Sequence, residues 1–150
     1  MAVVSGCDTG LGQGMAVGLA EAGCDIVGIN IVEPTETIER VTALGRRFLS
    51  LTADLRQIDG IPQLLERAVA EFGHIDILVN NAGGGGPKPF DMPMADFRRA
   101  YELNVFSFFH LSQLVAPEME KNGGGVILTI TSMAAENKNK IGRASCRERV

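Results

Sequence analysis

Short apolar runs alternate with stretches of helical periodicity along most of this 150-residue chain. The runs show little polar alternation, which is typical of strands buried on both faces of a parallel sheet. Right-handed crossovers between such strands place helices on both faces of the sheet. The expected strands are 2–5, 25–30, 48–52, 75–79 and 126–130, and the expected helices are 11–22, 35–44, 61–72 and 95–119, the last of them possibly two. This order predicts an α/β fold with a doubly wound parallel sheet.

Composition excludes several classes of protein. The net charge of −4, from 14 basic and 18 acidic residues, argues against a nucleic-acid partner, because such domains usually carry a basic face. No apolar run approaches the ~20 residues that a membrane helix needs, so we expect no membrane span. Cys7, Cys24 and Cys146 stand at no metal-ligand spacing. We therefore expect reduced thiols, no metal site and a cytoplasmic location.

A glycine-rich turn directly follows the first expected strand and opens the first expected helix. Gly6, Gly10 and Gly12 lie where the backbone must approach a ligand without Cβ atoms in the way. The unpaired N–H groups and positive dipole end of the helix favour a pyrophosphate. The turn predicts a dinucleotide site, although similar turns also occur in proteins that bind nothing there.

The spacing of these glycines, G-x-x-x-G-x-G, resembles the turn of the short-chain dehydrogenase/reductase family. Four further segments resemble motifs of that family and occur in the same order. They are Asp54-Leu55, Asn80-Asn81-Ala82-Gly83, Leu103-Asn104-Val105 and Thr129-Ile130-Thr131-Ser132. The resemblance implies a Rossmann-like sheet, truncated here after the fifth strand, and dehydrogenase chemistry on a small molecule.

The resemblance also implies roles for individual residues. Asn104 and Ser132 match catalytic residues, and Asp54 matches an acid that hydrogen-bonds adenine. Substrate is expected at Gly85, Ser132 and Asn137. The expected cofactor-binding residues are Gly6, Thr9, Gly10, Leu11, Gly12, Asn30, Ile31, Asp54, Leu55, Asn81, Ala82 and Gly83.

The choice of nicotinamide cofactor depends on cations, because a 2′-phosphate needs basic partners near the end of the second strand or in the glycine turn. Thr9 stands where NADP-dependent members of the family often carry Arg or Lys, and residues 28–33 contain no basic residue. NAD is therefore the expected cofactor. Asn30 replaces the Asp common in NAD-dependent relatives, and its amide is expected to hydrogen-bond a ribose hydroxyl.

The family's catalytic tyrosine and lysine have no counterpart at the matching spacing. The tyrosine is expected 13 residues beyond Ser132, where the chain has Ser145, and the lysine four residues later, where it has Arg149. A serine hydroxyl is a far weaker acid than a phenol, and arginine stays protonated in proteins. We expect this chain to lack acid–base catalysis, which leaves a non-catalytic nucleotide-binding fragment as the alternative to an active dehydrogenase.

Different parts of the chain resemble different branches of the family. Residues 1–82 resemble sugar-acid dehydrogenases, and residues 83–138 resemble bacterial hydroxysteroid dehydrogenases, so the substrate stays open and the chain is interpreted as chimaeric. Residues 1–140 are expected to form a partial dinucleotide-binding domain. Residues 141–150 show neither alternation nor an apolar stripe and resemble translated adapter sequence, so we expect a foreign tail.

The resemblance further implies that full-length relatives are homo-oligomers. Residues 105–119 are apolar around much of the expected helix, which suits one side facing the sheet and the other a partner. A plain core helix is the alternative. The expected fifth strand has no later strand to cover its outer edge, and uncovered edges favour aggregation.

Overall fold

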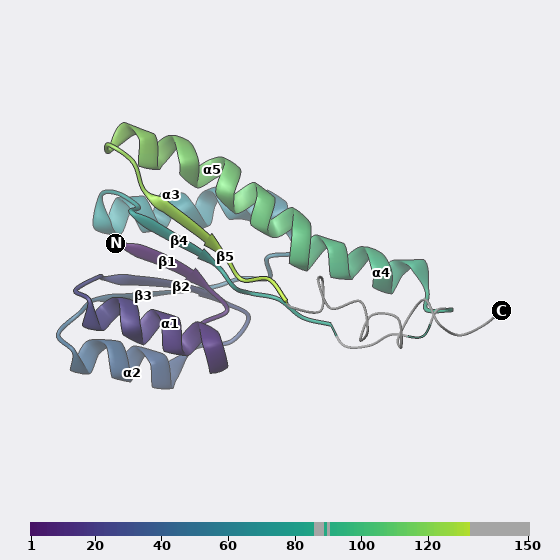
Figure 1. Ribbon diagram of the computed structural model, residues 1–150, viewed down its shortest axis with the longest axis horizontal. Coiled ribbons are helices and arrows are strands. Elements are labelled where there is room, and N and C mark those ends of the chain that lie inside the picture. The colour runs from purple at the N-terminus through teal and green to yellow at the C-terminus, as the bar shows by residue number, and fades with distance from the viewer. Residues whose placement is uncertain (86–88, 90, 133–150) are drawn as a thin grey trace.

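The computed structural model describes residues 1–85, 89 and 91–132. Its centre is a five-stranded sheet in the order β3-β2-β1-β4-β5, in which every neighbouring pair is parallel (Figure 1). The strands are β1 (Ala2–Ser5), β2 (Ile26–Asn30), β3 (Phe48–Thr52), β4 (Ile77–Asn80) and β5 (Val126–Thr129). The expected fold class and the number and order of the strands are confirmed. The fourth strand begins at Ile77, two residues later than expected.

Helices cover both faces of this sheet (Figure 1). They are α1 (Gly10–Glu21), α2 (Thr35–Ala43), α3 (Ile61–Phe72), α4 (Met94–Tyr101) and α5 (Ser107–Lys121), with a short 3-10 turn η1 (Ile58–Gly60). Neighbouring residues of a strand point to opposite faces, so Val4 packs in the cluster with α1 and α2, whereas Val3 packs in the cluster with α3 and α5.

The expected helix 95–119 is continuous but changes its winding in the middle. Glu102–Phe106 forms a π-helical segment, η2, between α4 and α5. Such segments are rare and frequently lie at functional sites. Here the segment contains Asn104, one of the residues expected to be catalytic.

The buried face of α1 differs from the one that the large apolar residues indicate. The spacing of Leu11, Met15, Leu19 and Ala22 favours these as the core face, but Leu11 is 74% exposed. The buried positions are Gly12, Ala16, Val17 and Ala20. Met15 and Leu19 are partly buried against the same cluster, whereas Leu11 turns away from it. The small residues Gly12, Ala16 and Ala20 allow the helix to lie close against the sheet.

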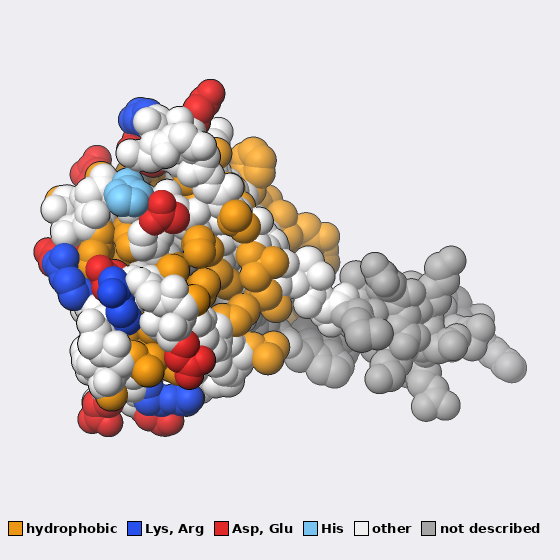
Figure 2. All heavy atoms as spheres, turned by 60° about the vertical axis from the view of Figure 1, so that its left-hand side comes forward, with side chains coloured by type: hydrophobic (Ala, Val, Ile, Leu, Met, Phe, Trp, Pro, Cys, Tyr) orange, Lys and Arg blue, Asp and Glu red, His pale blue; other side chains and the backbone are white. Residues whose placement is uncertain are grey.

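The outer strand β5 lies at the edge of the sheet and is exposed along its whole length. Val126 is 61% exposed and Leu128 46% exposed. Figure 2 shows hydrophobic side chains gathered on one face of the molecule, with charged side chains toward its margins. An exposed apolar edge strand is a site for pairing with another chain.

Ile127 lies in the middle of this edge and is 39% exposed, so Ile127→Lys is expected to reduce self-association. The measurement is light scattering as a function of protein concentration, with Leu44→Lys after α2, at a side chain that is 43% exposed, as a change of similar type away from the edge. Equal self-association of the Ile127→Lys variant and the unmodified chain would show that another surface drives it.

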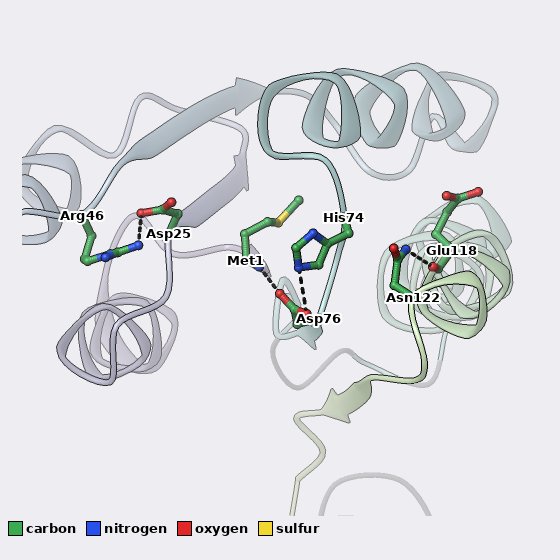
Figure 3. A network of polar contacts seen from close by, with 7 residues as sticks. All are labelled: Met1, Asp25, Arg46, His74, Asp76, Glu118 and Asn122. Atoms are coloured by element: carbon green, nitrogen blue, oxygen red, sulfur yellow. Dashed lines mark hydrogen bonds and ion pairs between the residues drawn. The ribbon is translucent and has the colours of Figure 1, made fainter.

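Ion pairs tie together the opposite end of the sheet, where the strands begin (Figure 3). The amino group of Met1 pairs with Asp76, which also contacts His74 Nε2 through Oδ1 at 3.2 Å. Arg46 Nη2 lies 2.7 Å from Asp25 Oδ1. A hydrogen bond from the Arg47 backbone N–H and the nearby guanidinium groups of Arg46 and Arg47 lower the pKa of Asp25. The polar contacts at the amino end of the sheet therefore stabilise the fold and lie away from the glycine turn.

Candidate cofactor cleft

A cleft of about 610 Å³ opens at the carboxyl ends of the strands, next to the glycine turn. It lies where the strand order reverses between β1 and β4, the place where ligands bind in open α/β sheets. The lining residues are Gly6, Asp8, Thr9, Leu11, Gly12, Ile29, Asn30, Ile31, Val32, Ala53, Leu55, Asn81, Ala82, Gly83 and Leu103. Most of the residues expected to bind a cofactor therefore line one cleft.

The glycine turn leaves no room for side chains at two of its positions. A Cβ on Gly12 would lie 1.9 Å from the carbonyl oxygen of Gly6 and 2.5 Å from Nδ2 of Asn81. Gly6 has a φ of +65°, which L side chains rarely adopt, and its Cβ would lie 2.8 Å from Cα of Ala82. Glycine at both positions is what lets the turn and the segment after β4 lie in contact.

Hydrogen bonds clamp the turn to that segment. Asn81 Nδ2 donates to the carbonyl oxygens of Ser5 at 3.1 Å and Gly6 at 2.8 Å. The buried Ser5 hydroxyl accepts from the backbone N–H groups of Asn81 and Ala82, at 2.9 and 3.0 Å, and donates to Val79. The end of β1 and the end of β4 thus form a single rigid rim.

The chemistry of the cleft suits a nucleotide. Leu11, Ile31 and Val32 line it although each is more than half exposed, and exposed apolar side chains at a cleft suit a flat base. Among the described lining residues there is no Lys or Arg, and Asp8 is an acid. A phosphate here would depend on backbone N–H groups and the start of α1.

Two residues expected to bind the cofactor do not line the cleft, namely Gly10 and Asp54. Gly10 begins α1 with a φ of +61°. Asp54 accepts from Arg56 Nε at 2.9 Å, and this hydrogen bond lowers the pKa of the Asp54 carboxyl. The carboxylate therefore already has a charged partner, which competes with an adenine amino group.

Neither of the residues expected to be catalytic lines the cleft, although Leu103, the neighbour of Asn104, does. Asn104, in the π-helical segment, accepts from the Gly84 N–H at 3.1 Å and donates to the carbonyl oxygens of Gly84 and Ala100. It thereby holds the loop that contains Gly83 and Gly85. Ser132 follows β5 and is exposed. Asn137, Ser145 and Arg149 lie outside the described residues.

Several residues of the site were not predicted from the sequence. Ser5 carries the clamp, Thr37 donates to the carbonyl oxygen of Cys7, and Ala53 and Leu103 line the cleft. A serine at the end of a strand, directly before the glycine turn, was the available signal for Ser5. No sequence signal indicated Thr37, because its partner Cys7 lies 30 positions earlier in the chain.

The thiol of Cys7, within the glycine turn, is fully buried, and burial raises its pKa to about 11. The half-buried Cys24 is expected to react first with a disulfide reagent near neutral pH, with Cys7 protected until the chain opens. Because the pKa of the Cys7 thiol is higher in the folded chain than the ordinary value of 9.0, its full contribution to the free energy of unfolding is present below about pH 9. That contribution is lost as the pH rises toward 11.

The labelling order is measured as the rate of reaction of each thiol in a Cys146→Ser background. The pH dependence is measured as the free energy of unfolding at a series of pH values. Rapid labelling of Cys7 in the folded protein would contradict its burial.

Comparison with known proteins identifies the family to which the chain belongs. The family model described as short chain dehydrogenase matches residues 1–144, so the chain belongs to the short-chain dehydrogenase family. The resemblance stated from the motifs is confirmed.

Two relatives with high identity to this chain carry different names. The chain is 67% identical over 135 residues to 2-dehydro-3-deoxy-D-gluconate 5-dehydrogenase of Escherichia coli K12, covering 89% of this chain and 53% of that protein. It is 58% identical over 140 residues to 7alpha-hydroxysteroid dehydrogenase of the same strain, covering 92% and 55%. The chain thus spans about half the length of the curated relatives it matches.

Among solved structures, the chain is similar to a 7 alpha-hydroxysteroid dehydrogenase complexed with NADH and 7-oxo glycochenodeoxycholic acid. The TM-score is 0.89 at 55% identity, over 95% of this chain and 57% of that one.

No described helix is long and apolar enough to cross a membrane. The described residues also contain no group of three or more His, Cys, Asp or Glu side chains that could hold a metal ion.

Proposed function

We propose that this chain binds NAD(H) in the cleft between the glycine turn and the end of β4. The observation that supports this most directly is the turn itself, closed by Gly6 and Gly12 and leading into the start of α1 at the reversal of strand order. Backbone N–H groups at such a helix start suit a pyrophosphate. Leu11, Ile31 and Val32 would cover the adenine base, with Asn81, Ala82 and Gly83 on the opposite rim.

The electrostatics of the cleft support NAD over NADP. A 2′-phosphate needs a cationic partner, and the described lining residues supply Asp8 but no cation. The relative solved with NADH is consistent with this preference.

The reaction we propose for the family chemistry is oxidation of a secondary alcohol. When bound, the nicotinamide supplies the hydride acceptor. Asn104 holds the loop over which substrate would lie, and Ser132 is the hydroxyl proposed to hydrogen-bond the reacting oxygen. The two relatives with high identity support a sugar acid, 2-dehydro-3-deoxy-D-gluconate, or a 7α-hydroxysteroid as substrate.

For the chain as given, we propose binding without turnover. Ser145 and Arg149 stand where the family places a tyrosine and a lysine, and loss of acid–base catalysis alone lowers rates about 10²–10⁴-fold. In this proposal residues 1–140 form a partial dinucleotide-binding domain and residues 141–150 a foreign tail. A cytoplasmic location and a homo-oligomer of the longer relatives are part of the same proposal.

Calorimetric titration with NADH and NADPH tests the binding proposal. We expect NADH to bind at least about tenfold more tightly, because a hydrogen bond to a charged group is worth roughly 1.5–3 kcal/mol and the 2′-phosphate finds no cation here. Absence of heat with NADH on folded protein would overturn it.

Nicotinamide absorbance, followed with each candidate substrate, tests the absence of turnover. We expect no change in absorbance with either the sugar acid or the steroid. Multiple turnovers with either one would restore the active dehydrogenase.

A further inference from the structure

We propose that Asn30 and Thr37 are positioning residues that hold the glycine turn in the shape required for dinucleotide binding. The inference rests on the proposed NAD site and assigns two side chains to its construction. Both are at least nine-tenths buried, Asn30 at the end of β2 and Thr37 in the first turn of α2. Each makes a hydrogen bond to the backbone of Cys7, at the centre of the turn.

The peptide unit between Gly6 and Cys7 is held at both of its polar ends. Asn81 Nδ2 donates to its carbonyl oxygen at 2.8 Å, and its N–H donates to Asn30 Oδ1 at 2.6 Å. Asn81 directly follows β4 and Asn30 ends β2, and these two strands lie on either side of β1 in the sheet. Since the peptide unit is planar, fixing both ends fixes its orientation.

The next peptide unit is held by Thr37. Its hydroxyl donates to the carbonyl oxygen of Cys7 at 2.7 Å. In a trans peptide unit the N–H points opposite to the carbonyl, so the Asp8 N–H points away from Thr37. Asp8 lines the cleft. Thr37 therefore sets the direction of a backbone donor beside the proposed phosphate position.

A chain of side chains on α1 and α2 supports Thr37. Gln13 Nε2 donates to Thr37 Oγ1 at 3.1 Å, and Arg40 Nη1 donates to Gln13 Oε1 at 3.1 Å. The Thr37 hydroxyl is thus both donor and acceptor, which fixes its rotamer. A side chain whose rotamer is fixed by its neighbours can keep the atoms of a binding site in the geometry that binding needs.

The contacts of Asn30 favour holding the turn over reading a ribose. Its Oδ1 is occupied by the Cys7 N–H, and its Nδ2 is buried with no partner among the described residues. Gly28 makes room for this arrangement, since a Cβ there would lie 2.7 Å from Cys7 Sγ and 3.0 Å from Asn30 Nδ2. A ribose hydroxyl would have to displace the Cys7 N–H to reach Oδ1, and to reach Nδ2 it would have to enter a position that is buried.

Titration of NADH into the full chain tests the role of Thr37. Thr37→Val, which keeps the shape but removes the hydroxyl, is expected to weaken NADH binding about three- to tenfold, the value of one neutral hydrogen bond. Thr37→Ser is expected to restore it. Thr42→Val is the matched control, because in the described part of the chain the Thr42 hydroxyl bonds only within α2, to the carbonyl oxygens of Ile38 and Glu39.

Titration of ADP and 2′-deoxy-ADP tests the role of Asn30. Asn30→Ala is expected to weaken both nucleotides by the same factor, because the turn and not the ribose is disturbed. Loss of ADP binding with 2′-deoxy-ADP unchanged would show that Asn30 reads the hydroxyl, and would overturn its positioning role.

The outcomes separate this inference from the proposed function. If the unmodified chain binds NADH and Thr37→Val binds it equally, the positioning role of Thr37 is wrong while the NAD site stands. If the unmodified chain binds neither NADH nor ADP, the site itself is wrong. Melting temperatures recorded alongside show whether a variant is folded, and Gln13→Met, which removes the bond to Thr37 from a half-buried position, replaces Thr37→Val if that variant does not fold.

Discussion

Gly12→Ala is expected to weaken NADH binding strongly. The new Cβ would lie 1.9 Å from the Gly6 carbonyl oxygen, a backbone atom that cannot swing aside, and 2.5 Å from Asn81 Nδ2. The glycine turn and the segment after β4 must then separate. Overpacking of this kind costs typically 1–3 kcal/mol, so we expect NADH affinity, measured by calorimetry, to fall by about a hundredfold.

Gly14→Ala provides the matched control on the same helix. A Cβ on Gly14 meets nothing within 4 Å, so the substitution introduces no clash. Alanine is favoured over glycine inside a helix by roughly 0.5–1 kcal/mol, and this variant is expected to melt at a higher temperature with unchanged NADH affinity. Equal binding by the two variants would mean that the close contact at Gly12 does not shape the site.

Ser5→Ala is expected to be the most destabilising small change in the clamp. Its hydroxyl accepts from two backbone N–H groups, those of Asn81 and Ala82, and is fully buried. Each orphaned donor costs about 1–3 kcal/mol, so we expect a loss of roughly 2–4 kcal/mol in the free energy of unfolding, measured by urea denaturation. NADH affinity is expected to fall with it.

Ser50→Ala is the comparison for this effect. Ser50 lies on β3 and its hydroxyl donates to Glu33 Oε2 at an exposed position. Surface changes of this kind usually stay within about 0.5 kcal/mol. A Ser5→Ala variant as stable as Ser50→Ala would show that the two N–H groups find other partners.

The sequence predicted the fold well because its signals are local. The apolar runs that became β1 to β5 and the glycines that ended the helices act over a few neighbouring residues. The glycine turn was predicted for the same reason. Gly6 and Gly12 had to be glycines, and the structure shows the contacts that require it.

Features that depend on distant residues could not be predicted in this way. The small-residue face of α1 was missed because large apolar side chains dominate a periodicity count, whereas close packing on the sheet selects small ones. The hydrogen bond of Thr37 to Cys7 joins residues 30 positions apart. The pairing of Asp54 with Arg56 is local, but it depends on a side-chain direction that spacing does not encode. The ribose role expected for Asn30 stays a prediction.

The clamp between the end of β1 and the end of β4 also has a consequence for the order of assembly. Its partners, Ser5 and Gly6 on one side and Asn81 and Ala82 on the other, stand 75 to 77 positions apart in the chain. During synthesis the first strands and helices can form before β4 has emerged from the ribosome. The cleft proposed to bind a dinucleotide, the cradle between the glycine turn and the end of β4, cannot form until then. A ligand that recognises only the closed cradle would then favour the fully assembled state by mass action.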